Sequence, residues 1–205
     1  MGSRNQWEAT RRELILDYLL EHKGFLLASE AVREGLDAKV LQRMARDGDL
    51  ERVAHGFYAD SSFQWDPLLL AQHRCPKGIF SMDTALFLHR LIKRRPARWA
   101  LTIPSGSSCS LMADPAYRFF YLKSTSWKLG QVSVLSPYGH PVLAYDPERT
   151  LCDCLRRPDD VDRDEFMHAL RNYLDSPIRN KKLLLEYADA LHVRGVMEPY
   201  LEVLR

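Results

Sequence analysis

The sequence predicts an α+β protein made of two parts, and three observations lead to this prediction. Helical periodicity with clear stop signals dominates residues 1–48, and a short hairpin pattern follows. From Trp99 the period changes to that of strands, separated by Pro, Gly and Ser turns, and helical segments then close the chain. We expect one domain over residues 1–62 and a second over residues 63–205, joined at Asp60-Ser61-Ser62.

The first part contains three helix candidates, each followed by a glycine that can stop it. Their expected ranges are 7–22, the two turns after an N-cap at Ser29, and 38–46 after an N-cap at Asp37. We expect Phe25-Leu26-Leu27 to be an extended link. Two short strands, 50–53 and 57–59, flank Ala54-His55-Gly56. Three helices followed by a hairpin is the order of a winged helix-turn-helix.

The third helix separates apolar from polar residues. At 100° per residue, Val40, Leu41 and Met44 share one face, while an amide and several cations share the other. Arg recognises guanine, Gln recognises adenine, and Lys binds guanine or phosphate. A solvated helix face gives the same pattern, but the preceding helix and following wing favour DNA binding. The candidate DNA-binding residues are Lys39, Gln42, Arg43 and Arg46 on the helix, and Arg52 and His55 at the wing.

The second part begins with two helices and then alternates with strands. Asp66-Pro67 starts a helix through about His73, and Ser81 starts another that directs apolar residues inward. The inward residues are Ala85, Leu86, Leu88 and Leu91. Four strands are expected over 99–103, 117–122, 131–135 and 142–145. The closing helices are expected over 147–156, 164–174, 181–192 and 196–204, which gives a C-terminal α+β domain with a small sheet.

Charge is unevenly distributed along the chain. The net charge is +2, but residues 61–150 hold 11 Lys and Arg against 5 Asp and Glu, a net +6. This argues against a polycation that coats nucleic acid and directs attention to local patches. One basic run has three interpretations: a solvated helix end, a DNA backbone contact, or a surface for an acidic partner. Its residues are Arg90, Lys93, Arg94, Arg95 and Arg98.

Composition narrows the class and the compartment. Apolar runs of only four residues exclude a membrane span, and no secretory signal precedes the first helix, so we expect a cytoplasmic protein. The four cysteines are too few and too unevenly spaced for a disulfide framework, and we expect them to be reduced. Of the Cys152-Asp153-Cys154 triplet, we expect Cys152 in the core, Cys154 without a role, and no metal. Arg149 and Asp153 are expected to form an ordinary helix pair.

One motif bears on an enzymatic function. Gly106-Ser107-Ser108 after a strand is how a polymerase-β-type nucleotidyltransferase site begins, but such a site needs two carboxylates one residue apart. The only acid nearby is Asp114, in Asp114-Pro115-Ala116. We therefore predict no catalytic residues, no metal and no cofactor.

Four segments carry a family resemblance that covers nearly the whole chain. They are ARDGDLERVAHGFYA (45–59), SMDTALFLHRL (81–91), PARWALTIPSG (96–106) and YDPERTLCDCLR (145–156). Together they resemble the AbiEi antitoxins of AbiE-type (type IV) toxin-antitoxin systems. The resemblance implies an N-terminal winged helix that represses its own operon and a C-terminal antitoxin domain that counteracts a nucleotidyltransferase-like toxin.

Two functional hypotheses follow. The first is a DNA-binding antitoxin and autorepressor, whose partners are double-stranded operator DNA and the toxin, with or without direct contact. The second is a winged-helix regulator that responds to a small-molecule effector and has no toxin. A neighbouring gene with a nucleotidyltransferase-like motif would favour the first hypothesis.

Overall fold

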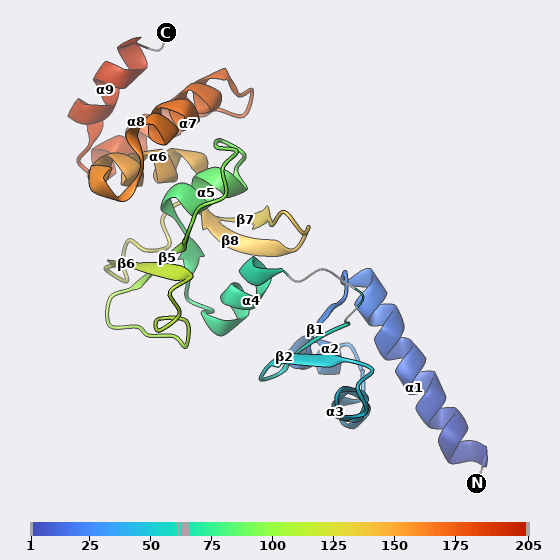
Figure 1. Ribbon diagram of the computed structural model, residues 1–205. Helices are drawn as coiled ribbons and strands as arrows, with labels where there is room; N and C mark the ends of the chain where they lie inside the picture. Colours follow the sequence, from blue (N-terminus) through green and yellow to red (C-terminus); the bar gives the residue numbers. More distant parts are fainter. Residues whose placement is uncertain (1, 61, 63–65, 204–205) are drawn as a thin grey trace. The chain divides into compact units, whose positions relative to one another are not determined.

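The chain divides into two compact units, Met1–Asp66 and Pro67–Arg205. The computed structural model describes residues 2–60, 62 and 66–203 (Figure 1). Helix accounts for 47% of the structure and strand for 18%, so the fold is mixed α and β, as predicted. The expected linker residue Ser61 and the expected start of the second domain at Phe63 lie outside the described residues.

The N-terminal unit combines three helices with a three-stranded antiparallel sheet. Its elements are α1 (Gly2–Glu21), β1 (Phe25–Leu27), α2 (Ala28–Arg33), α3 (Ala38–Asp47), β2 (Glu51–Ala54) and β3 (Phe57–Ala59). The strand order is β1-β3-β2. The expected extended link is therefore a strand, because Phe25 pairs with Ala59 and Leu27 with Phe57. Three helices and a winged sheet form the predicted winged helix-turn-helix.

Helix starts in this unit are stabilised in two different ways. The carboxylate of Asp37 accepts hydrogen bonds from the amides of Lys39 and Val40, which confirms the predicted cap of α3. The predicted cap at Ser29 is wrong, since α2 starts at Ala28 without a side-chain cap. The amide of Ala28 donates instead to the carbonyl of Gly56, 2.9 Å away in the wing turn. The hairpin thus replaces a local capping side chain.

The C-terminal unit is built around a five-stranded mixed sheet. Its strands are β4 (Ile79–Phe80), β5 (Trp99–Pro104), β6 (Tyr117–Leu122), β7 (Gln131–Leu135) and β8 (Pro141–Tyr145), in the order β6-β5-β4-β8-β7. Four of them were predicted, and the two-residue β4 at the centre was not. β5 runs parallel to β6 and β4 parallel to β8, whereas β4 is antiparallel to β5 and β7 to β8.

Helices flank this sheet, and those that follow the last strand gather at one end of the unit (Figure 1). They are α4 (Pro67–Arg74), α5 (Met82–Leu88), α6 (Pro147–Arg156), the 3-10 helix η1 (Pro158–Asp160), α7 (Arg163–Asp175), α8 (Lys181–Ala190) and α9 (Arg194–Val203). The apolar residues expected to face inward are buried, although α5 ends at Leu88 and Leu91 follows it. Ser81 precedes α5 but does not cap it; its hydroxyl accepts a hydrogen bond from Thr102.

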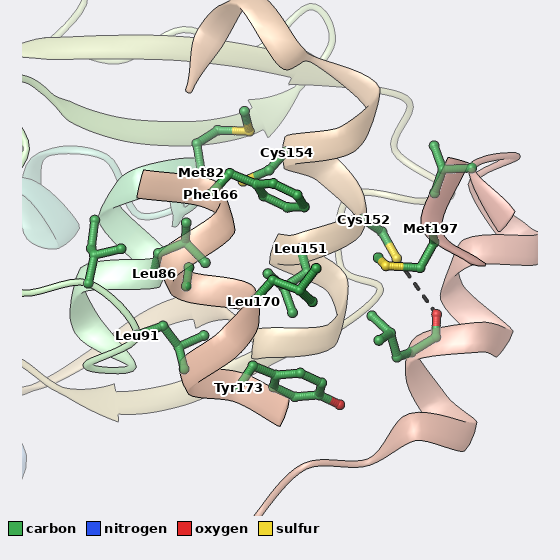
Figure 2. Close-up of a cluster of buried hydrophobic side chains, with 14 of the residues drawn as sticks. Met82, Leu86, Leu91, Leu151, Cys152, Cys154, Phe166, Leu170, Tyr173 and Met197 are labelled. Carbon is green, nitrogen blue, oxygen red and sulfur yellow. Dashed lines mark hydrogen bonds between the residues drawn. The ribbon is translucent and has the colours of Figure 1, made fainter. Parts of the chain in front are cut away.

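The largest apolar cluster lies among these helices (Figure 2). Cys152 is buried there, as predicted, and its thiol donates to the carbonyl of Leu184 over 3.7 Å. The expectation that Cys154 has no role is wrong, because its side chain is also buried in this cluster beside Phe166. Burial raises the pKa of the Cys154 thiol well above its ordinary value, so the side chain packs as a neutral group.

Arg149 is the most unusual buried residue of this unit. Its side chain is fully buried, and its Nε donates to Asp153 over 2.8 Å. Its Nη1 donates to the carbonyl of Leu129 over 2.9 Å, and the guanidinium lies 4.6 Å from the centre of the Tyr145 ring. The predicted helix pair of Arg149 and Asp153 is therefore present, but it lies inside the protein, and Arg149 also joins α6 to the loop before β7.

No helix among the described residues is long and apolar enough to cross a lipid bilayer.

Candidate nucleic-acid interface

Helix α3 presents its polar residues to solvent and its apolar residues to the core. Val40, Leu41 and Met44 are at most 3% exposed. The opposite face combines one amide with three cations, all of them exposed: Lys39, Gln42, Arg43 and Arg46. The structure thus places the four predicted residues together on one surface of one helix. A face of this composition provides the donors that base edges and phosphates accept.

Two arginines of α1 hold α3 at both ends. Arg11 forms an ion pair with Asp37 at the start of α3. Arg12 forms an ion pair with Asp49 just past its end, and its Nη1 also lies 3.9 Å from Asp47. These contacts were not predicted from the sequence, since the paired residues are 26 and 37 positions apart in the chain. α1 therefore fixes the direction in which the exposed face of α3 points.

The electrostatics of the cap strengthen this arrangement. The pKa of Asp37 lies below its ordinary value, because its carboxylate accepts a hydrogen bond from the Lys39 amide and is close to Arg11. The other end of α3 stops at Gly48, whose φ of 87° is the left-handed conformation that glycine adopts most readily. Both ends of the helix are thus defined by residues that the sequence analysis identified.

Arg46 lies close to an acidic neighbour at the end of α3. Its Nε lies 3.6 Å from a carboxylate oxygen of Asp47, and both side chains are exposed. An exposed pair of this kind is weak, so a phosphate competes for the guanidinium at low cost. The position of Arg46 in the last turn of α3 fits a contact with the DNA backbone better than a contact with a base.

The wing brings its two candidate residues into direct contact. Arg52 on β2 donates to Nδ1 of His55 in the turn over 3.1 Å, and both side chains are exposed. Because a guanidinium can only donate, Nδ1 must accept and the proton of a neutral imidazole lies on Nε2. Arg52 pairs with Tyr58 in the ladder, and a bulge between Arg52 and Ala54 interrupts the register just before the turn that carries His55. The wing tip therefore presents a guanidinium and an imidazole N–H side by side.

The basic run of the second unit is less uniform than its sequence suggests. Arg98 donates to the carbonyls of Pro115 and Tyr117 over 3.0 and 2.5 Å, so it holds the start of β6. Arg95 lies 4.8 Å from the centre of the Trp99 ring, and Arg94 lies 3.6 Å from Glu165. Arg90 and Lys93 are exposed. Three of the five predicted patch residues thus have partners within their own unit.

The dismissed enzyme motif has a local explanation. The carboxylate of Asp114 accepts a hydrogen bond from the amide of Ala116 over 3.0 Å, which closes a turn before β6. Across the part of the chain that the structure describes, no three His, Cys, Asp or Glu residues are grouped so that they could hold a metal ion.

A comparison with known families finds one match, which lies in the first unit. Residues 13–59 match the family model described as a transcriptional regulator, AbiEi antitoxin. This part of the N-terminal unit is similar to an AbiEi regulator. The match runs from the middle of α1 to the end of β3, so it includes all six candidate DNA-binding residues. It covers 47 of the 205 residues, and no curated protein matches the chain.

The AbiEi match supports the role of a DNA-binding transcriptional regulator. The three resembling segments of the second unit, 81–91, 96–106 and 145–156, lie outside the matched residues. Their assignment rests on the resemblance alone. The buried Arg149 of the last segment is part of the interior of the second unit rather than of a surface site.

Proposed function

We propose that this protein is a DNA-binding antitoxin that represses its own operon and counteracts a nucleotidyltransferase-like toxin. The observation that carries the DNA-binding half is the exposed face of α3, held at both ends by α1, inside the residues that match an AbiEi regulator. In this proposal Lys39, Gln42 and Arg43 contact base edges in the major groove. Arg46, Arg52 and His55 contact the backbone.

Operator binding is tested by fluorescence anisotropy with a duplex that covers the DNA upstream of the gene. The Lys39/Gln42/Arg43 triple alanine variant should lose specific binding, while Arg46→Ala should weaken binding to operator and random DNA alike and reduce the salt dependence. Arg171→Ala is the matched control, since it removes one exposed cation from α7 in the other unit. Operator affinity equal to wild type in the triple variant would contradict the assignment.

The antitoxin half of the proposal draws on the resemblance of the second unit and on the net +6 of residues 61–150, a charge that steers acidic partners. It is tested with the full-length triple alanine variant, coexpressed with the adjacent toxin gene from an independent promoter. Rescue of growth by this variant would show that neutralisation does not need DNA binding. Loss of rescue, with rescue by wild type from the same promoter, would mean that neutralisation depends on the α3 face.

A further inference from the structure

A cavity of about 380 Å³ lies between helices of the second unit. Its lining residues are more than 90 positions after the candidate DNA-binding residues in the chain. Its wall combines the end of α6 and η1 with the start of α7 and one residue of α9. The lining residues are Cys154, Leu155, Pro158, Val161, Arg163, Phe166 and Tyr200. Cavities of roughly 300 to 1,000 Å³ with an apolar wall and few polar groups are typical of small-molecule sites.

Most of the wall is apolar or aromatic. The rings of Phe166 and Tyr200 meet edge to face with their centres 5.6 Å apart. The neutral thiol of Cys154 adds a soft, weakly polar surface beside Phe166 (Figure 2). An edge-to-face aromatic pair leaves a ring face and a ring edge available, and a third ring stacks well against either of them. The wall therefore favours a ligand with an aromatic or aliphatic body.

Arg163 is the single charged residue in this wall. Its side chain is exposed, and no ion pair of Arg163 occurs among the residues that the structure describes. Three neighbouring acids are engaged elsewhere. Asp162 caps α7, Asp160 lies 3.8 Å from Arg157, and Glu165 lies 3.6 Å from Arg94. A guanidinium at the edge of an apolar cavity matches a carboxylate by charge and by its paired donors.

We propose that this cavity binds a small monocarboxylic acid, with its apolar body against Phe166 and Tyr200 and its carboxylate on Arg163. The proposal is independent of DNA binding by α3. A regulator that responds to a small-molecule effector needs such a site. The site is also compatible with an antitoxin.

The experiment uses the full chain and one pair of probes. 4-Phenylbutyrate carries the carboxylate, and 4-phenylbutan-1-ol has the same body without the charge. For ligands of this size, a Kd on the order of 1 mM is expected. Saturation-transfer NMR detects binding, and a ¹⁵N-labelled sample locates it through shifts of the amides of Val161, Phe166 and Tyr200. Phenylbutyrate should bind about fivefold more tightly than the alcohol.

Two variants test the assignment of the wall. Arg163→Gln should reduce the affinity for phenylbutyrate about fivefold and leave the alcohol unchanged, whereas Arg171→Gln, on the same helix but outside the cavity, should change neither. Val161→Phe adds a ring to the wall and should abolish binding of both probes. If its melting temperature falls, Tyr200→Leu replaces it, because Tyr200 is only half-buried.

Three results would overturn the proposal. Absence of binding of either probe at 10 mM, or binding that neither wall variant changes, removes the site. Equal binding of the two probes, with no effect of Arg163→Gln, removes the carboxylate and leaves a neutral apolar ligand as the only class that fits.

Discussion

Arginines of the two units are placed in opposite environments. On α3, Arg43 and Arg46 are exposed on the face that the core does not use. In α6, Arg149 is fully buried and bonded to Asp153 and to a backbone carbonyl. A guanidinium on the surface can reach a ligand, whereas a buried one needs partners within the protein to offset the cost of desolvation. Burial, rather than residue type, separates a candidate binding residue from a structural one.

Arg149 is closely packed, although its Nη2 has no hydrogen-bond partner among the described residues. A Cβ added at Gly130 would lie 2.7 Å from the Cβ of Arg149, so a glycine is needed there for α6 to approach the loop. Gly130 also has a φ of 76°, in the left-handed region. On α3, by contrast, the side chains of Lys39 and Gln42 are exposed and form no hydrogen bond or ion pair with the other described residues. We therefore expect substitutions around Arg149 to destabilise the fold, and substitutions on the exposed face of α3 to affect DNA binding alone.

The largest effect is expected from Arg149→Met. It leaves Asp153 partly buried without its main partner, which should lower the free energy of unfolding by about 3 to 5 kcal/mol. Urea denaturation followed by circular dichroism measures the loss. The matched control is Arg156→Met, which removes a second, more exposed partner of Asp153 and should cost no more than about 1 kcal/mol. Similar losses in both variants would mean that burial does not distinguish these arginines.

The next effect concerns DNA affinity rather than stability. Arg43→Ala should weaken operator binding by about 1 to 3 kcal/mol, because a base-reading guanidinium is lost, and should weaken random-DNA binding much less. The free energy of unfolding should change by no more than about 0.5 kcal/mol, since the side chain is exposed. Fluorescence anisotropy titrations with the operator duplex and with a random duplex give the ratio of the two affinities. A loss that is identical on both would reassign Arg43 to the phosphate backbone.

A smaller effect follows from the cap of α3. Asp37→Ala should destabilise the first unit by about 1 to 2 kcal/mol, and Asp37→Asn by less, because asparagine also caps helices. The folded pKa of Asp37 is below the ordinary 3.8, so the charge contributes stability above pH 3.8 that disappears as the pH falls through the lowered pKa. The difference between wild type and Asp37→Asn should therefore vanish in acid. Amide hydrogen exchange of α3 measures it, and a difference that grows in acid would contradict the sign.

The sequence predicted the features whose causes are local. Asp37 and Gly48 delimit α3 through contacts within a few residues, and the 100° period alone separated its two faces. β1 and β4 were missed because segments of three and two residues become strands only through distant partners, such as Ala59 for Phe25. The spacing of Arg149 and Asp153 is the same for an exposed pair as for a buried one, so the pattern could not reveal burial.

For the candidate sites too, the sequence predicted what depends on nearby residues and missed what depends on distant ones. All six residues predicted for DNA contact lie on adjoining local elements, α3 and the β2–β3 hairpin, and all are exposed. The cavity near Arg163 was not predicted, because its wall combines residues from 154 to 200 that converge only when α6, α7 and α9 pack together. The basic run between residues 90 and 98 was predicted as one patch for the same reason. The partners of Arg98 and Arg94 lie on β6 and α7, far away in the sequence.

The smallest effect is expected in that basic run, and it sharpens the contrast between exposed and enclosed ion pairs. The side chain of Arg94 is 81% exposed and lies 3.6 Å from Glu165, whereas the side chain of Arg118 is 20% exposed and lies 2.6 Å from Asp83. Water and salt screen the first pair, so Arg94→Gln should change the free energy of unfolding by no more than about 0.5 kcal/mol. Arg118→Gln should cost clearly more, because burial raises the pKa of Asp83 and the charged carboxylate depends on its partner. Urea denaturation at 20 mM and 500 mM NaCl measures the loss of unfolding free energy in each of the two variants. A large, salt-insensitive loss in Arg94→Gln would show that this arginine belongs to the fold, and the basic run would then offer only Arg90 and Lys93 to a partner.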